Sequence, residues 1–316
     1  MIVPSPALSA SGRRRVAAGA AAYLQLGKPR VVALIVFTAV VGMMLAPGAP
    51  SPAVVLAATL GIAMAASSAA AFNHVLDRRA DALMARTRAR PLPTHQLSVR
   101  QAVGFAVVLA VLAGTTLVLG VNTLTAVLTL CALVGYSVVY TVVLKPLTPQ
   151  NIVLGGAAGA APPVLGWTAV TGEVGLDALL LFLIVFVWTP PHFWSLALYR
   201  RNEYAAAGIP MLPLTHGSRY TRASILAYTL VLAAVAALPF ATGMSGGAYL
   251  AGALALSAAF VGYAWRLYRD YSDALARRTF RFSIHYLAAL FALLLLDRYG
   301  SALGALVSPI AFVHAS

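Results

Sequence analysis

Long apolar runs separated by short polar links dominate this chain. Each run holds about 20 residues, the length that an α-helix needs to cross the hydrocarbon of a bilayer. We place nine such runs at residues 31–47, 52–72, 101–120, 123–143, 150–171, 177–198, 223–243, 246–266 and 281–301. The pattern predicts an all-α membrane protein with about nine transmembrane helices.

The flanks of these runs suggest a simple division of the chain. Residues 1–30 read as an N-terminal arm on the cytoplasmic side, residues 31–302 as one polytopic membrane domain, and residues 303–316 as a short C-terminal tail. No soluble module interrupts the membrane domain in this interpretation.

Composition supports the membrane interpretation and limits what the charge can mean. The chain is 61% hydrophobic and 9% charged, with a net charge of +14, whereas soluble domains have about 25% charged residues. The basic residues fall in the N-terminal arm and in the links on one side of the bilayer, with Arg298 as the exception. This asymmetry is typical of cytoplasmic loops, so it explains the charge without a nucleic-acid partner. We therefore predict a multi-pass protein of the cell (inner) membrane, with its N-terminus and polar loops in the cytoplasm and lipid as its environment.

A polar stretch directly after the second run carries the strongest chemical signal. Asn73, Asp77 and Asp81 recur every four residues, and on a helix this spacing places all three on one face. Carboxylate and amide oxygens suit a hard divalent cation such as Mg²⁺. The stretch therefore predicts a Mg²⁺ site at the mouth of the membrane domain.

Basic residues near this stretch suggest that the bound ion accompanies a phosphate group. Arg86 and Arg90 follow the acids at a spacing of four, and Lys145 follows the fourth run. Guanidinium and ammonium groups bind phosphate oxygens well. The alternative for these three residues is simple anchoring at the cytoplasmic face.

Further polar residues mark the inner ends of later runs. His192 lies within the sixth run in VWTPPHFW, where an imidazole is costly and thus a functional candidate. We expect Pro190 and Pro191 to break that helix. The link after the sixth run offers Asn202, Glu203 and Tyr204, which could complete a cation site from the opposite side.

Several blocks together resemble the protoheme IX farnesyltransferases, a branch of the UbiA-type intramembrane prenyltransferase superfamily. The resemblance covers roughly residues 20–300. It rests on the N-x3-D-x3-D pattern followed by MARTRARPLP, and on YTVVLKPLTPQNIVLGGAAGAAPPVLGW, WTPPHFWSLALYR, EYAAAGIPMLP and FRFSIHYLAALFALLLLD. The chain departs from the family at two places. It has Lys145–Pro146 where the family usually has Lys-Arg, and it has Asn202–Glu203 where the family usually has acidic residues before the tyrosine of its second loop.

The resemblance implies a ring of nine helices around a central cavity. It also implies transfer of a farnesyl group from farnesyl diphosphate to a vinyl group of heme b, with water added and diphosphate released. Heme would be a substrate and Mg²⁺ the cofactor, held by Asn73, Asp77 and Asp81. On this basis we assign His192, Tyr136 and Tyr140 to the heme side, where His192 would ligate the iron or orient the heme.

Two other functions stay open on sequence grounds. A related enzyme that prenylates an aromatic or quinone precursor would share the acidic pattern. A non-catalytic heme-delivery or transport protein would share the apolar spans. As protein partners we consider a second copy of the chain and a downstream heme-handling membrane enzyme.

Overall fold

The computed structural model describes residues 19–311, with side chains for residues 19–300. Within that range the chain is helical throughout and contains no strand. A short helix, Gly19–Leu26, comes first. The others are α2 (Pro29–Leu45), α3 (Pro52–Leu83), α4 (Val99–Gly120), α5 (Thr123–Val134), η1 (Gly135–Leu144), α6 (Lys145–Leu147), α7 (Asn151–Ala160), α8 (Pro162–Thr171), α9 (Leu176–Tyr199), α10 (Arg201–Ala206), α11 (Leu212–Thr215), α12 (Gly217–Ala241), α13 (Gly247–Arg269) and α14 (Asp273–Ala311).

The helices confirm the predicted membrane spans. In the described part of the chain, eight helical segments are long and apolar enough to cross a bilayer. A ninth is obtained when Gly19–Leu26 and α2, which are bent by 47° at their junction, count as one span. The main difference concerns α3, which runs eleven residues past the predicted end at residue 72 and carries the acidic stretch on the same helix.

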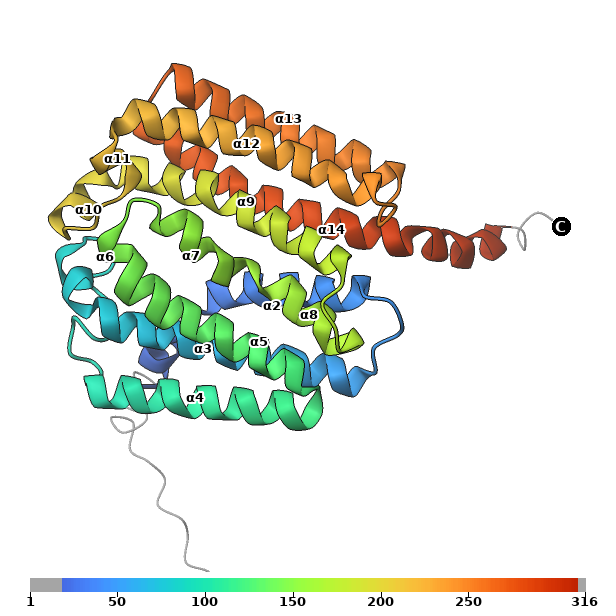
Figure 1. Ribbon diagram of the computed structural model, residues 1–316, viewed down its shortest axis with the longest axis horizontal. Helices are drawn as coiled ribbons and strands as arrows, with labels where there is room; N and C mark the ends of the chain where they lie inside the picture. Colours follow the sequence, from blue (N-terminus) through green and yellow to red (C-terminus); the bar gives the residue numbers. More distant parts are fainter. Residues whose placement is uncertain (1–18, 312–316) are drawn as a thin grey trace, which may run out of the picture.

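The long helices run side by side, and the elaborated connections gather at one end of the bundle (Figure 1). The segment after α3, the single turn of α6, and the short helices α10 and α11 all lie there. The turns after α2, α4, α8 and α12 lie at the opposite end. Chain regions far apart in sequence therefore meet at one polar end.

Two pairs of helices approach each other at glycines. A Cβ atom on Gly42 of α2 would collide with the Pro163 carbonyl of α8, and a Cβ on Gly166 of α8 would collide with the Ala39 carbonyl of α2. Likewise, Gly155 of α7 lies under the ring of Tyr140 in η1. Small residues let membrane helices pack backbone to backbone in this way.

Prolines act differently in the two spans that contain Pro-Pro pairs. Pro162 and Pro163 begin α8 after a break from α7. The prediction that Pro190 and Pro191 break their helix is wrong, because α9 is continuous through both. α9 packs against α7, α12 and α14, and neighbouring helices make membrane prolines tolerable.

The division into arm, membrane domain and tail stays a prediction. Residues 1–18 of the arm and 312–316 of the tail lie outside the described residues. The first described helix is packed against the bundle, with Ala22 and Leu26 buried beside Val75 of α3.

Candidate functional site

The acidic stretch forms the last three turns of α3. The N-terminus of α3 lies at the other end of this helix, where Pro52 is its first residue and Ser51 accepts a hydrogen bond from the Val54 N–H. At the C-terminal end, Asn73 and Asp81 are buried at 4% exposure, while Asp77 is partly buried. The predicted helix spacing is thus observed, and the three side chains form a polar row, which we call the acidic ladder.

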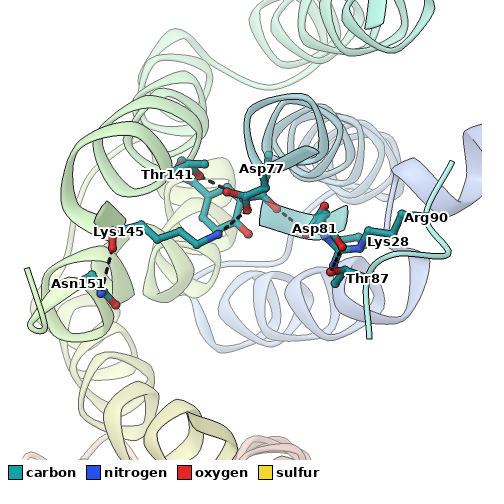
Figure 2. A network of polar contacts seen from close by, with 10 residues as sticks. Lys28, Asp77, Asp81, Thr87, Arg90, Thr141, Lys145 and Asn151 are labelled. Atoms are coloured by element: carbon teal, nitrogen blue, oxygen red, sulfur yellow. Dashed lines mark hydrogen bonds and ion pairs between the residues drawn. The ribbon is translucent and has the colours of Figure 1, made fainter. Parts of the chain in front are cut away.

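Each member of the acidic ladder is bonded to a cation from a different part of the chain (Figure 2). Lys28 donates to Asn73 Oδ1 at 2.7 Å, and Arg90 donates to Asp81 Oδ2 at 2.7 Å. Lys145, the first residue of α6 directly after η1, donates to Asp77 Oδ2 at 2.5 Å. Two carboxylates and one amide therefore face three basic side chains, and the cluster suits an additional anion.

Lys28 is the member that sequence reasoning missed. It lies between the first helix and α2, in a left-handed backbone conformation (φ 49°) that is uncommon for a residue with a side chain. This conformation, together with the following Pro29, turns the chain so that the ammonium group reaches Asn73, 45 residues away. A basic residue beside a proline at the membrane surface looks like an ordinary anchor in the sequence.

The π-helix η1 brings a second polar row to the acidic ladder. Thr141 accepts a hydrogen bond from Asn73 Nδ2 (3.2 Å) and donates to the carbonyl of Tyr136, five residues earlier (2.8 Å). Tyr136 and Tyr140 stack with ring centroids 5.5 Å apart. Wide helical turns of this kind often occur at functional sites, and here the wide turn orders the Asn73 amide.

The link after α9 lies close to the loop that follows α3, but Glu203 takes no part in the ion pairs of the acidic ladder. Glu203 binds Arg200 (2.5 Å) and accepts a weak hydrogen bond from the Arg86 backbone N–H (3.4 Å). Tyr204 is buried, and this burial raises its pKa, so the hydroxyl stays a donor at neutral pH. Asn202 is exposed. In the described residues, no hydrogen bond or ion pair joins Glu203 to the acidic ladder, so its predicted role as a cation ligand stays a prediction.

The two predicted arginines occupy different environments. Arg90 is mostly buried and committed to Asp81. The Arg86 side chain is exposed, and among the described residues it has no ion pair. Arg86 lies on the same loop, four residues before Arg90.

His192 belongs to a separate group on α9 and α14. Its ring is buried, with 7% exposure, between Trp188 and Phe280. Its Nδ1 lies 2.7 Å from Ser283 Oγ. The sequence singled out His192 but gave no sign of Ser283, which is 91 positions away.

The acidic ladder has the right chemistry for Mg²⁺. Its donors are the amide oxygen of Asn73 and the carboxylates of Asp77 and Asp81, and Mg²⁺ takes one or two carboxylates together with substrate phosphate and water. Among the described residues no three His, Cys, Asp or Glu side chains are grouped as a metal site, so this donor set offers two carboxylates and one amide, and phosphate and water would have to supply the other ligands.

Fold and site together define a polytopic α-helical membrane protein with a polar ion-pair cluster at one end of its helix bundle. The UbiA prenyltransferase family model matches residues 35–287, so the chain belongs to this family and is a prenyltransferase. Its relatives include the protoheme IX farnesyltransferases of Thiobacillus denitrificans (63% identity; 88% of this chain and 93% of that protein) and Marinobacter nauticus (59% identity; 88% and 92%).

Solved structures agree on the fold. A digeranylgeranylglyceryl phosphate synthase superimposes with a TM-score of 0.74 (14% identity, 88% of this chain and 98% of that chain). A UbiA homolog from Aeropyrum pernix gives 0.71 (18% identity, 85% and 98%). A UbiA homolog from Archaeoglobus fulgidus, solved with GPP and Mg²⁺, gives 0.58 (19% identity, 86% and 99%).

Proposed function

We propose that this protein transfers a farnesyl group from farnesyl diphosphate to a vinyl group of protoheme IX. Water adds in the same reaction, giving heme O and diphosphate. The supporting relatives carry this activity in their names at 56–63% identity. The observation that carries the proposal is the cluster in which three cations from distant segments converge on the acidic ladder.

The diphosphate end of the substrate belongs at this cluster. Lys145, Arg90 and the exposed Arg86 offer N–H donors to the oxygens that gain charge as the allylic C–O bond breaks. Preorganised donors lower the barrier most where charge develops. Asn73, Asp77 and Asp81 would hold Mg²⁺, the ion with which a distant UbiA homolog was solved together with GPP. The ion would supply Lewis-acid stabilisation of the leaving diphosphate.

The acceptor end belongs near His192, Tyr136 and Tyr140. The C1–O bond of farnesyl diphosphate breaks with its electron pair going to diphosphate. The vinyl π electrons form the new C–C bond, and water captures the cation left beside the porphyrin ring. Loss of one proton from that water completes the hydroxyl group. The aromatic side chains of η1 and α9 give the flat ring a surface on which to pack.

The same arrangement supports an inner-membrane location with the polar end in the cytoplasm. Basic residues gather in the segment after α3 and around α10, at the end of the bundle that carries the acidic ladder. Arg298 follows Asp297, which accepts a hydrogen bond from the Gly246 N–H just before α13, at the other end. This is the distribution of cytoplasmic loops in multi-pass proteins.

The deciding experiment supplies membranes containing the protein with heme b, 4-hydroxybenzoate, labelled farnesyl diphosphate and Mg²⁺. We expect a farnesylated hydroxyethyl heme, identified by mass, together with one diphosphate per product. Label appearing instead in 4-hydroxybenzoate would assign the protein to aromatic prenylation. Heme uptake without any diphosphate release would point to heme delivery and overturn the proposal.

A further inference from the structure

The His192 ring is held on both faces and one edge. Trp188, one turn earlier in α9, stacks on it at 4.3 Å with an angle of 19° between the planes. Phe280 of α14 stacks on the other face at 4.6 Å and 27°. Phe193 meets it edge-on at 5.0 Å. The imidazole therefore has a fixed plane, and its two nitrogens are the atoms left to interact.

Hydrogen bonds around Ser283 decide which of these nitrogens carries the proton. Ser283 Oγ lies 2.7 Å from the Phe280 carbonyl oxygen and 2.7 Å from His192 Nδ1. A carbonyl oxygen can only accept, so the single hydroxyl proton of Ser283 is used there. The serine oxygen must then accept from His192, which places the imidazole proton on Nδ1.

A second bond keeps Ser283 in place independently of its side chain. Trp188 Nε1 donates to the Ser283 backbone carbonyl at 2.7 Å, and Ser283 is fully buried. The α9–α14 contact at this level is thus anchored by the backbone, and the hydroxyl is available for orienting the histidine.

The remaining nitrogen, Nε2, has its lone pair available. Within the described residues Nε2 makes no hydrogen bond. It is not fully buried, in contrast to the two ring nitrogens of His74, which are fully buried and have no hydrogen-bond partner. A neutral imidazole with Nδ1–H bonded to oxygen and Nε2 open is the form in which histidine binds metals.

We infer that Ser283 is a positioning residue that presents His192 Nε2 as an axial ligand to the iron of the porphyrin substrate. This inference rests on the proposed function, because that function is what brings an iron porphyrin to the protein. The hydrogen bond to Ser283 selects the tautomer and makes Nε2 more basic, so it strengthens the iron–nitrogen bond.

Heme titration of the purified full-length protein tests this without turnover. We compare Ser283→Ala, which removes the acceptor, with Ser283→Thr, which retains a hydroxyl. Loss of an outer partner of a metal-bound histidine lowers metal affinity about 10–100-fold. We expect that loss for ferrous heme in Ser283→Ala, a lower Fe–His stretching frequency by resonance Raman, and near-normal values in Ser283→Thr. Metal-free protoporphyrin IX should bind both variants equally.

A second variant covers the case in which Ser283→Ala does not fold. His192→Gly leaves a slot between Trp188 and Phe280, and added imidazole should restore the Fe–His band. 1-Methylimidazole can ligate iron but cannot donate to Ser283, so it should restore the band poorly. Equal rescue by both compounds, or an unchanged band in Ser283→Ala, would overturn the inference.

Failure of the proposed function gives a different result. In that case no farnesylated heme forms from the wild-type protein, whatever the Raman band shows. If wild-type protein makes the product but its ferrous heme shows no histidine-bound band, the proposed function stands and the role of Ser283 is rejected.

Discussion

At the scale of single residues, the acidic ladder owes its arrangement to its partners more than to its spacing. Asn73 is oriented from both ends of its amide, because Lys28 donates to the oxygen while the nitrogen donates to Asp77 (2.8 Å) and Thr141. A buried amide with all groups satisfied is rigid. The side chain is therefore fixed before any ligand contacts it.

Replacing Asp77 by Asn keeps the shape of the side chain but removes one charge. We expect turnover to fall by on the order of 100-fold or more, the scale typical for loss of one charge-stabilising group, while the fold is retained. Product formation in membranes measures the loss. Asp177→Asn, in the first turn of α9 at the opposite end, is the matched control and should keep wild-type activity; equal activity of both variants would contradict the role of Asp77.

Lys28→Met tests the residue that the sequence did not reveal. It removes one positive charge facing the substrate and frees the Asn73 amide. Hydrogen bonds to charged groups contribute roughly 1.5–3 kcal/mol, so we expect KM for farnesyl diphosphate to rise at least about tenfold. Arg30→Met removes an exposed charge two residues away and should leave KM unchanged. If Lys28→Met and Arg30→Met had the same KM for farnesyl diphosphate, Lys28 would be excluded from substrate binding.

At the scale of elements, close helix packing places the polar residues. The pair α2 and α8 approaches through Gly42 and Gly166, each against the backbone of the other helix. Through α2, this contact fixes the position from which Lys28 reaches α3.

Gly166→Ala is expected to destabilise the bundle. Its new methyl group would overlap the Ala39 carbonyl, and overpacking of this kind costs about 1–3 kcal/mol. The loss is measured as a lower thermal unfolding midpoint in detergent. Gly159→Ala provides the control, since a Cβ there meets nothing within 4 Å. A midpoint unchanged by Gly166→Ala would show that α2 can move away from α8 at little cost.

At the scale of the whole molecule, the ends of the bundle differ in charge and in elaboration. The end with the acidic ladder carries the long loops, α10 and α11 (Figure 1). The turn between α8 and α9 at the other end contains exposed Glu173.

Cysteine labelling in intact cells tests the proposed orientation. After Cys131→Ala, the variants Arg88→Cys and Glu173→Cys each place one exposed thiol at a known end. An impermeant maleimide should label Glu173→Cys directly and Arg88→Cys only after permeabilisation. The reverse pattern would invert the orientation.

Local patterns in the sequence were enough to predict much of this molecule. Apolar length predicts the spans, and the spacing of Asn73, Asp77 and Asp81 predicts their common helix face, since both depend on neighbours in the chain. Lys28 and Ser283 act on partners 45 and 91 positions away, and no periodicity carries that information. Pro190 and Pro191 show the opposite error, because a strong local signal is overridden by packing against neighbouring helices.

The basic surroundings of the acidic ladder have a consequence for the order of assembly. Lys28, Arg90 and Lys145 already occupy oxygens of the ladder, so this cluster opposes a bare divalent ion and attracts a polyanion. Magnesium should thus arrive already chelated by pyrophosphate, and its apparent affinity should be weak until the isoprenoid is present.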